Sequence, residues 1–204
     1  MTYAIQELVI RDVAPVDTGE ITDLVTEAMW DGRVARWLNP DPVGRRRDSP
    51  GYFGIFVEHA VRFGEVYATA DAETGRLSGV ALWFPFTSLI PAPADYDTRL
   101  KEVTGPAYDR ACELDAALEA RHPLDAHHYL AFLAVHPDHQ GHGVGSALLD
   151  RHHARLDRAG IAAYLEANDP RNRDLYRRHG YVCSSEITLP DGPSIWPMWR
   201  APMP

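Results

Sequence analysis

The stretch "HPDHQGHGVGSALLD" (residues 136–150) contains three glycines spaced two apart, Gly141, Gly143 and Gly145. An apolar run with helical spacing follows it at once. The first turn of a helix leaves backbone N–H groups without partners and carries a partial positive charge. Glycine lets the backbone adopt φ > 0 and approach a ligand closely. Residues 140–146 therefore predict either a cradle for a phosphate or diphosphate, or a tight strand-to-helix turn without a ligand.

Two common phosphate-binding loops do not fit this stretch. The nucleoside-triphosphate loop ends in Lys and Ser or Thr, and no Lys is present here. The dinucleotide fingerprint G-x-G-x-x-G, counted from Gly141, has Ser146 at its last position. The flanks are more regular: a nearly continuous apolar strand at 127–137, expected to be buried on both faces, and a helix ending near Gly160.

Bulk composition narrows the class of protein. The chain has 204 residues and a net charge of −9, which fits one globular domain and disfavours a nucleic-acid binder. It lacks an apolar run of membrane-spanning length and a signal-peptide pattern. Its two cysteines, Cys112 and Cys183, suggest a reduced compartment. We expect a cytoplasmic protein that binds neither nucleic acid nor a membrane.

Periodicity predicts mixed strands and helices, hence an α/β or α+β fold in one domain. The segment 38–51, dense in Pro, Gly and charge and containing Arg45-Arg46-Arg47, is predicted to be a solvated loop. The strands are expected at 5–13, 65–86 (two strands joined by a turn at Thr74-Gly75), 127–137, 161–168, 181–189 and 194–202, and the helices at 17–30, 52–63, 107–122, 145–160 and 170–180.

The stretch "LAVHPDHQGHGVGSALL" resembles the acetyl-CoA motif of the GCN5-related N-acetyltransferases (GNAT superfamily). The family loop Q/R-x-x-G-x-G/A is matched by Gln140, Gly143 and Gly145. The resemblance continues through "YLEANDPRNRDLYRRHGY" and "PDGPSIWPMWR", and so covers about 70 residues. In pattern it is closest to the puromycin-type acetyltransferases of actinobacteria.

The resemblance implies a GNAT fold over residues 1–204. The central sheet would be mixed, mostly antiparallel and flanked by helices, with a splayed, bulged strand before the diphosphate loop. Residues from about 1 to 125 would form the acceptor side, and residues from about 126 to 200 would bind acetyl-CoA.

The resemblance also assigns the residues that bind acetyl-CoA. The backbone of residues 133–135 would pair with the pantetheine arm, and the backbone amides of the loop would hold the diphosphate. The side chains of two asparagines and one tyrosine would also contact the cofactor. His142 stands where the family often has Arg or Lys, and an imidazole is a less constant positive charge near neutral pH than either. Arg171 and Arg173 are candidates for the 3′-phosphate. The assigned residues are Leu133, Ala134, Val135, Gln140, Gly141, His142, Gly143, Val144, Gly145, Ser146, Asn168, Asn172 and Tyr176.

Two residues are assigned to catalysis. Tyr176, in "RNRDLYRRHGY", occupies the place of the family's general acid, which protonates the leaving thiolate. Glu166 in "YLEAN" is the candidate for the base, or for a carboxylate that binds the amine. A water chain without a single protein base is the alternative, and the other candidate bases are Glu58, Asp31, His127 and His128.

The acceptor is expected to be a primary amine on a bulky or aromatic small molecule, such as an antibiotic, acetylated directly in a ternary complex. Aromatic residues beside acidic ones suit such a cation. The candidates are Trp30, Trp37, Trp83, Phe84, Phe86, Trp196 and Trp199. The alternatives are a non-catalytic acyl-CoA sensor or partner subunit, and an acetyltransferase for protein N-termini or lysines. A homodimer is possible.

Three histidines, His136, His139 and His142, are spaced three apart, and two doublets occur at 127–128 and 152–153. A zinc site needs three or four converging ligands. No cysteine or acidic residue fits such a set beside these histidines, so the sequence predicts no metal. Acetyl-CoA, as the acyl donor, is the one cofactor expected.

Overall fold

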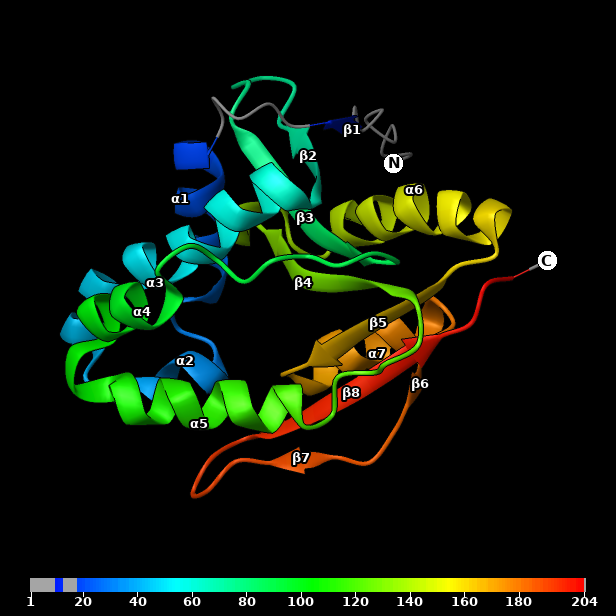
Figure 1. Cartoon of the computed structure of the whole chain (residues 1–204). Coiled ribbons are helices and arrows are strands. Elements are labelled where there is room, and N and C mark those ends of the chain that lie inside the picture. Colours follow the sequence, from blue (N-terminus) through cyan, green and yellow to red (C-terminus); the bar gives the residue numbers. More distant parts are fainter. Residues whose placement is uncertain (1–9, 13–17, 204) are drawn as a thin grey trace.

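The computed structural model describes residues 10–12 and 18–203. In this part of the chain one sheet runs in the order β1-β2-β3-β4-β5-β8-β6, and β7 pairs with β8 (Figure 1). Every neighbouring pair is antiparallel except β4 with β5. The strands are β1 (Ile10–Asp12), β2 (Glu65–Ala70), β3 (Leu77–Phe86), β4 (His127–Val135), β5 (Ala162–Ala167), β6 (Val182–Cys183), β7 (Ile187–Thr188) and β8 (Ser194–Arg200).

Helices cover both faces of this sheet (Figure 1). They are α1 (Thr18–Met29), α2 (Arg33–Leu38), α3 (Pro42–Phe63), α4 (Tyr96–Thr104), α5 (Tyr108–Glu119), α6 (Val144–Ala159) and α7 (Pro170–Arg178), with single 3₁₀ turns η2 (Gly105–Ala107) and η3 (Pro137–His139). The mixed, mostly antiparallel sheet between helices that the sequence predicted is confirmed. Among the described helices, none combines the length and the apolar character needed to cross a membrane.

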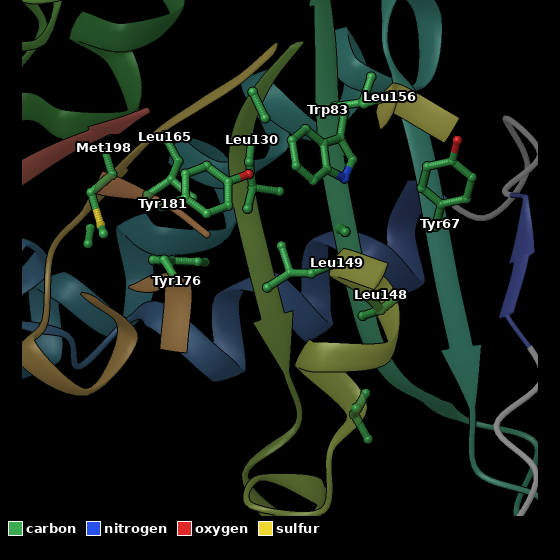
Figure 2. Close-up of a cluster of buried hydrophobic side chains, with 14 residues drawn as sticks. Tyr67, Trp83, Leu130, Leu148, Leu149, Leu156, Leu165, Tyr176, Tyr181 and Met198 are labelled. Carbon is green, nitrogen blue, oxygen red and sulfur yellow. The ribbon is translucent and has the colours of Figure 1, made fainter. Parts of the chain in front are cut away.

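Strand β3 separates two parts of the core because its side chains alternate between the two faces of the sheet. Ala81 and Trp83 join α6 and α7 on one face, whereas Val80 and Leu82 join α1 and α3 on the other. Figure 2 shows the first cluster, with Trp83 and Tyr67 at one end and Tyr176, Tyr181 and Met198 at the other. Because β3 is packed on both faces, it holds β4 in place beside it. Strand β4 in turn leads into the loop of residues 140–146, called the glycine loop below.

A third apolar cluster joins α2 and α5 to the end of the chain. It contains Trp37, Leu114, Ile187, Leu189 and Ile195. The indole N–H of Trp37 also donates to the Pro190 carbonyl at 2.8 Å. The N-terminal helices are thus fastened to β7 and β8, so the two halves of the sequence share one continuous structure.

The loop predicted at 38–51 is wrong, because Pro42 begins the long helix α3. Asp41 caps this helix by accepting from the amides of Val43 and Gly44, and proline is favoured in the first turn, where its missing N–H costs nothing. Nor is the arginine run solvated throughout, since the Arg45 side chain is buried and its guanidinium donates to Asp31 at 2.7 Å. Capping and long-range pairing outweigh the low helix propensity of this segment.

Smaller differences concern one divided strand and two short helices. The strand predicted at 181–189 is divided into β6 and β7, because Cys183 and Ile187 are four residues apart while their partners on β8, Met198 and Ile195, are three apart. The extra residue interrupts the ladder. The strand predicted at 5–13 lies largely outside the described residues. Helices α2 and α4 have no counterpart in the prediction.

Candidate active site

Strands β4 and β5 separate partway along their length. They pair only over residues 127–129 and 162–164, although β4 continues to Val135. Against β3 the register of β4 shifts between Leu82 and Trp83, which leaves Ala131 as an extra residue. Such a bulge bends a strand. The splayed, bulged strand is therefore confirmed, and in the described structure no strand pairs with the β5-facing edge of residues 130–135.

This opening changes the burial of β4. The strand was predicted to be buried on both faces, but Leu133 and Val135 are only partly buried, while Ala134 between them is fully buried. All three pair with β3 on one side, opposite Ala81, Val80 and Gly79. The continuous apolar run predicted burial on both faces, whereas the splay implied by the family resemblance leaves residues 133 and 135 without a neighbouring strand on the gap side.

Two glycines hold the loop after β4 in left-handed conformations. Gly141 has φ 78° and Gly143 has φ 84°, and a Cβ added at either would meet no atom within 4 Å. In the described part of the chain we find no hydrogen-bond acceptor for the amides of residues 141–146. Gly143 immediately precedes α6, where the helix dipole is positive. The loop therefore presents open, unpaired N–H groups at a helix N-terminus.

Side chains at both ends of the loop brace it. The Gln140 side-chain amide donates to the Val135 carbonyl at 3.1 Å, which ties the loop to the end of β4. The Ser146 hydroxyl lies 3.1 Å from Nε2 of His179, whose Nδ1 lies 3.0 Å from the Asp150 carboxylate. These two side chains are thus occupied within the protein. The Gln140 backbone N–H is occupied too, since it donates to the Pro137 carbonyl at 3.3 Å, whereas the Ser146 backbone N–H has no acceptor in the described structure.

Val144 and Gly145 begin α6 against the protein interior. Val144 is buried in the core. A Cβ on Gly145 would lie 3.6–3.8 Å from side-chain atoms of Leu133, Val135 and Leu175, which is ordinary contact. His142 is exposed between the two left-handed glycines. The first turn of α6 is therefore packed onto β4 and α7, with its amides at the surface of the gap.

Tyr176 lies on α7, which Asp169 caps by accepting from the Arg171 amide at 2.8 Å. Its ring is 7 % exposed and makes an edge contact with Tyr181 at 5.8 Å. Burial raises the pKa of the Tyr176 phenol, so it keeps its proton at neutral pH. No described residue forms a hydrogen bond with its hydroxyl, which leaves that proton available to a bound molecule.

Glu166 lies on β5, beyond the point where β5 leaves β4. Its Oε1 is enclosed and has no hydrogen-bond partner in the described structure. Burial raises the pKa of Glu166 to about 7, and the nearby hydroxyls of Tyr129 and Tyr164 limit that rise. A carboxyl with this pKa changes its protonation near neutral pH, as a general base must.

Glu166 and Asn168 line a cavity of about 520 Å³. Its walls are largely aromatic and aliphatic, and they come from the helices α1 to α5, the strands β3, β4, β5 and β8, and the proline-rich segment after β3. The aromatic lining residues are Tyr52, Phe53, Phe56, Phe84, Phe86, Tyr129 and Phe132. This volume and this lining are typical of a small-molecule site.

The sequence foresaw part of this lining. Phe84 and Phe86 were expected there, but Trp83 is fully buried and stacks on His152, with ring centroids 4.0 Å apart. The other tryptophans do not line the cavity either. The prediction missed Tyr52, Phe53 and Phe56 on α3 together with Tyr129 and Phe132 on β4. Three residues spaced along one helix at 52, 53 and 56 were the available signal.

The remaining candidates divide into accessible and occupied side chains. Asn168, just before α7, and Asn172, in its first turn, are both exposed, and their side-chain amides form no hydrogen bond in the described structure. Arg171 is exposed as well. Arg173 instead lies over the Trp196 ring, 4.8 Å from its centroid, and 3.5 Å from the Asp174 carboxylate. Arg173 is therefore less suited than Arg171 to a phosphate.

The other candidate bases lie away from the cavity lining. Glu58 forms an ion pair with Arg99 at 2.7 Å, and Asp31 forms ion pairs with both Arg36 and Arg45. His127 and His128 are buried in β4, where burial lowers the pKa of both imidazoles. Of the candidates from the sequence, Glu166 is the carboxyl that reaches the cavity.

Histidines also meet in places that the sequence did not indicate. Glu65 with His128 and His152, and Asp150 with His153 and His179, each bring three potential metal ligands together. Their nitrogens already have partners: His128 Nδ1 lies 3.1 Å from His152 Nε2, and His153 Nε2 lies 3.0 Å from the Tyr181 hydroxyl. These contacts explain the groups as internal packing and hydrogen bonding.

Comparison with known proteins agrees with this architecture. Residues 110–183 match the family model of the acetyltransferase (GNAT) domain. A structure from Corynebacterium glutamicum, of a "histone acetyltransferase HPA2 and related acetyltransferase", is 30% identical, with 97% of this chain and 98% of that chain covered and a TM-score of 0.74. The chain therefore belongs to the GNAT acetyltransferases.

More distant structures share the fold. Arylalkylamine N-acetyltransferase 2 from Aedes aegypti is 10% identical, with 97% of this chain and 100% of that chain covered and a TM-score of 0.69. A polyamine N-acetyltransferase from Drosophila melanogaster, which forms N-acetylagmatine, is 15% identical, with coverage of 96% and 100% and a TM-score of 0.65.

Proposed function

We propose that this protein transfers the acetyl group of acetyl-CoA to a primary amine of a small molecule, within one ternary complex. The observation that carries the proposal is the gap between β4 and β5, which opens at one end onto unpaired loop amides. Beside the gap, the cavity contains an enclosed carboxylate oxygen of Glu166. A donor site and an acceptor site thus meet at the point where the two strands part.

The residues of the loop fit acetyl-CoA. Open space above Gly141 and Gly143 would be filled by a Cβ, and unpaired amides at a helix N-terminus favour a diphosphate. Residues 133–135 have no strand on the β5 side and offer that edge to the pantetheine amides, apart from the Val135 carbonyl, which accepts from Gln140. Asn168, Asn172 and Arg171 are exposed nearby on α7 and its start. When bound, the thioester supplies an activated acyl group with a good leaving thiolate.

Each protein group then has one task in the transfer. Glu166 accepts a proton from the ammonium of the acceptor, so that the amine nitrogen can attack the acyl carbon. A backbone N–H of β4 stabilises the negative charge that develops on the carbonyl oxygen. The C–N bond forms as the C–S bond breaks, and Tyr176 donates its proton to the departing sulfur. The acylated nitrogen then gives up its second proton, which restores the Tyr176 phenol and leaves a neutral amide. Holding both reactants in place contributes much of the rate.

The cavity favours an acceptor with a bulky apolar body. Aromatic walls offer stacking and cation–π contact to an amine, while Glu166 offers the charge. Two structural neighbours act on arylalkylamines and polyamines, and we infer a small-molecule amine here too. The motif likeness to puromycin-type enzymes places aminonucleoside antibiotics among the amines to test. We also propose a cytoplasmic location, in keeping with the free thiols of Cys112 and Cys183.

Thiol release from acetyl-CoA, measured with an amine panel, tests the proposal. The panel contains arylalkylamines, alkylamines, an aminonucleoside and peptides with free N-termini or lysines. We expect turnover with small amines and little with peptides. Acetyl-CoA binding without turnover on any amine would instead favour the acyl-CoA sensor, and turnover confined to peptides would favour a protein acetyltransferase.

A further inference from the structure

The charges that face the cavity do not balance. Arg45 is neutralised by Asp31 at 2.7 Å and also donates to the carbonyl of Asn39. Asp48 is paired with Arg47 at 2.6 Å. Burial lowers the pKa of His59, so this lining residue is neutral at pH 7. After these pairs are set aside, two carboxyl groups remain without a cation.

The first unpaired carboxyl is Glu166 on the sheet wall, and the second is Asp115 on α5. Asp115 is half-buried and accepts a hydrogen bond from the Tyr96 hydroxyl at 2.7 Å. No Lys, Arg or His of the described chain pairs with it. Burial raises the pKa of Asp115, which shows that its negative charge is incompletely compensated inside the protein.

The two carboxyls lie on different walls, with aromatic rings between them. Tyr96, which holds Asp115, makes an edge contact with Phe56 at 5.9 Å, and Phe56 contacts Phe132 on β4 at 5.7 Å. Glu166 stands on the other side, beside Tyr129 of the same strand. The cavity thus joins a carboxyl on its helical wall to a carboxyl on its sheet wall across an apolar surface.

We propose that the acceptor is a diamine in the broad sense: a reacting amine at Glu166 and a second cationic nitrogen at Asp115, joined by an apolar spacer. This inference rests on the proposed function, because Glu166 marks the reacting end only if acetyl transfer occurs there. An ammonium or guanidinium at Asp115 supplies the missing countercharge. Binding it adds little desolvation cost at the Asp115 carboxylate, because that carboxylate is already partly buried in the protein. The spacer packs on the aromatic walls.

Calorimetry with matched amines tests this directly. Straight-chain α,ω-diamines with four to ten carbons are compared with the monoamines of the same length, with coenzyme A present so that no acetyl group can move. At the best chain length we expect the diamine to bind about tenfold to a hundredfold more tightly than its monoamine, the range for one charged hydrogen-bonded contact. Equal affinities at every length would overturn the inference.

Asp115→Asn should abolish this preference while leaving the affinity for the monoamine within about twofold. The control is Asp109→Asn, an exposed residue on the same helix that does not line the cavity. Tyr96→Phe, which removes the hydrogen bond to Asp115 but keeps its charge, should reduce the preference partially. Equal losses for diamine and monoamine in Asp115→Asn would mean a structural role and would overturn the inference.

Turnover separates this inference from the proposed function. A diamine preference in binding, with no acetylated product from any amine, would leave the second cation site standing and reject the transferase. If monoamines and diamines were acetylated with equal kcat/KM and bound with equal affinity, the transferase would stand and the second cation site would be rejected.

Discussion

At the scale of single residues, Tyr176 and Glu166, the acid and the base that we propose, occupy different surroundings. The phenol is packed in the core with its proton kept by burial. The carboxyl lines the cavity with a pKa of about 7. A protonated acid and a base that is partly ionised at neutral pH suit the two proton transfers of amine acetylation.

Tyr176→Phe should lower kcat about a hundredfold while leaving the KM for acetyl-CoA nearly unchanged, because only the donated proton is lost. Steady-state thiol release measures both constants. Tyr181→Phe is the matched control, since Tyr181 lies in the same cluster and its hydroxyl bonds His153 at 3.0 Å. Tyr176→Phe with full kcat would remove this residue from the role of acid.

Glu166 should give the reaction its pH dependence. A base must be deprotonated, so kcat/KM for the amine should rise with pH until about 7, the pKa that burial gives Glu166, and then level off. In Glu166→Gln this rising limb should disappear and kcat/KM should fall about a hundredfold. A pH–rate profile unchanged by the substitution would point to a water chain instead.

At the scale of elements, the loop of residues 140–146 and α6 form the donor site that we propose, and the far end of α6 provides a control position. Gly143 and Gly160 lie at opposite ends of this helix with φ of 84° and 66°, and a Cβ on either would meet nothing within 4 Å. Substitution to Ala should destabilise each protein by about 1 kcal/mol, because the left-handed backbone disfavours a side chain.

Only Gly143→Ala should also weaken the binding of acetyl-CoA, by at least about tenfold, since its Cβ enters the space proposed for the diphosphate. Thermal melts measure the first effect and calorimetry the second. Similar affinities in the two variants would show that the diphosphate does not approach Gly143.

Local chemistry explains why some elements were predictable. Strand β4, α6 and β5 follow one another with clear periodicity, and Gly160 ends α6 in a left-handed conformation, as a C-terminal glycine commonly does. The helix predicted at 52–63 is the second half of α3, but its first half was missed because Pro42, Gly44, Pro50 and Gly51 suggest a loop. Its stability depends on Asp41 and on distant Asp31, which periodicity does not reveal.

Of the candidate site, the sequence predicted only the part that lies within one contiguous motif. The glycine loop is contiguous in sequence, whereas the cavity gathers residues from α3, α5, β4 and β5. Asp115 gave no signal, since a carboxylate on an amphipathic helix normally faces solvent. Its partner Tyr96 is nineteen residues away on α4, a helix that the sequence did not suggest. Tertiary packing alone makes these two a pair.

At the scale of the whole molecule, a buried ion pair fastens the last strand to α6. The Arg200 side chain is 1% exposed and donates to both Asp157 carboxylate oxygens at 2.7 and 2.8 Å. Arg200 also donates to the His179 carbonyl at 3.0 Å, at the end of α7. These contacts join β8, α6 and the end of α7, beside the donor site that we propose.

Asp157→Asn should lower the free energy of unfolding at pH 7 by about 3 kcal/mol, because it leaves a buried guanidinium without its countercharge. Glu27→Gln, which breaks an exposed pair with Arg46, should cost less than about 1 kcal/mol. Denaturant titration compares the two. Equal effects would contradict the structural role given to Arg200.

The sign of the pH dependence follows from the same pair. Hydrogen bonds from Arg200 lower the pKa of Asp157 below its ordinary 3.8. The contribution to stability is therefore complete above that value and is lost as the pH falls through the lower pKa of the folded state. The difference between wild type and Asp157→Asn should shrink on acidification below pH of about 4.

The most direct test of the account compares two acetyl donors by calorimetry. Acetyl-CoA carries the diphosphate that residues 140–146 are proposed to hold, whereas S-acetylpantetheine has the same thioester and arm without it. We expect acetyl-CoA to bind at least about a hundredfold more tightly, since several charge-assisted amide contacts are at stake. Equal binding of the two donors, or no binding of either, would contradict the donor site on which the whole account depends.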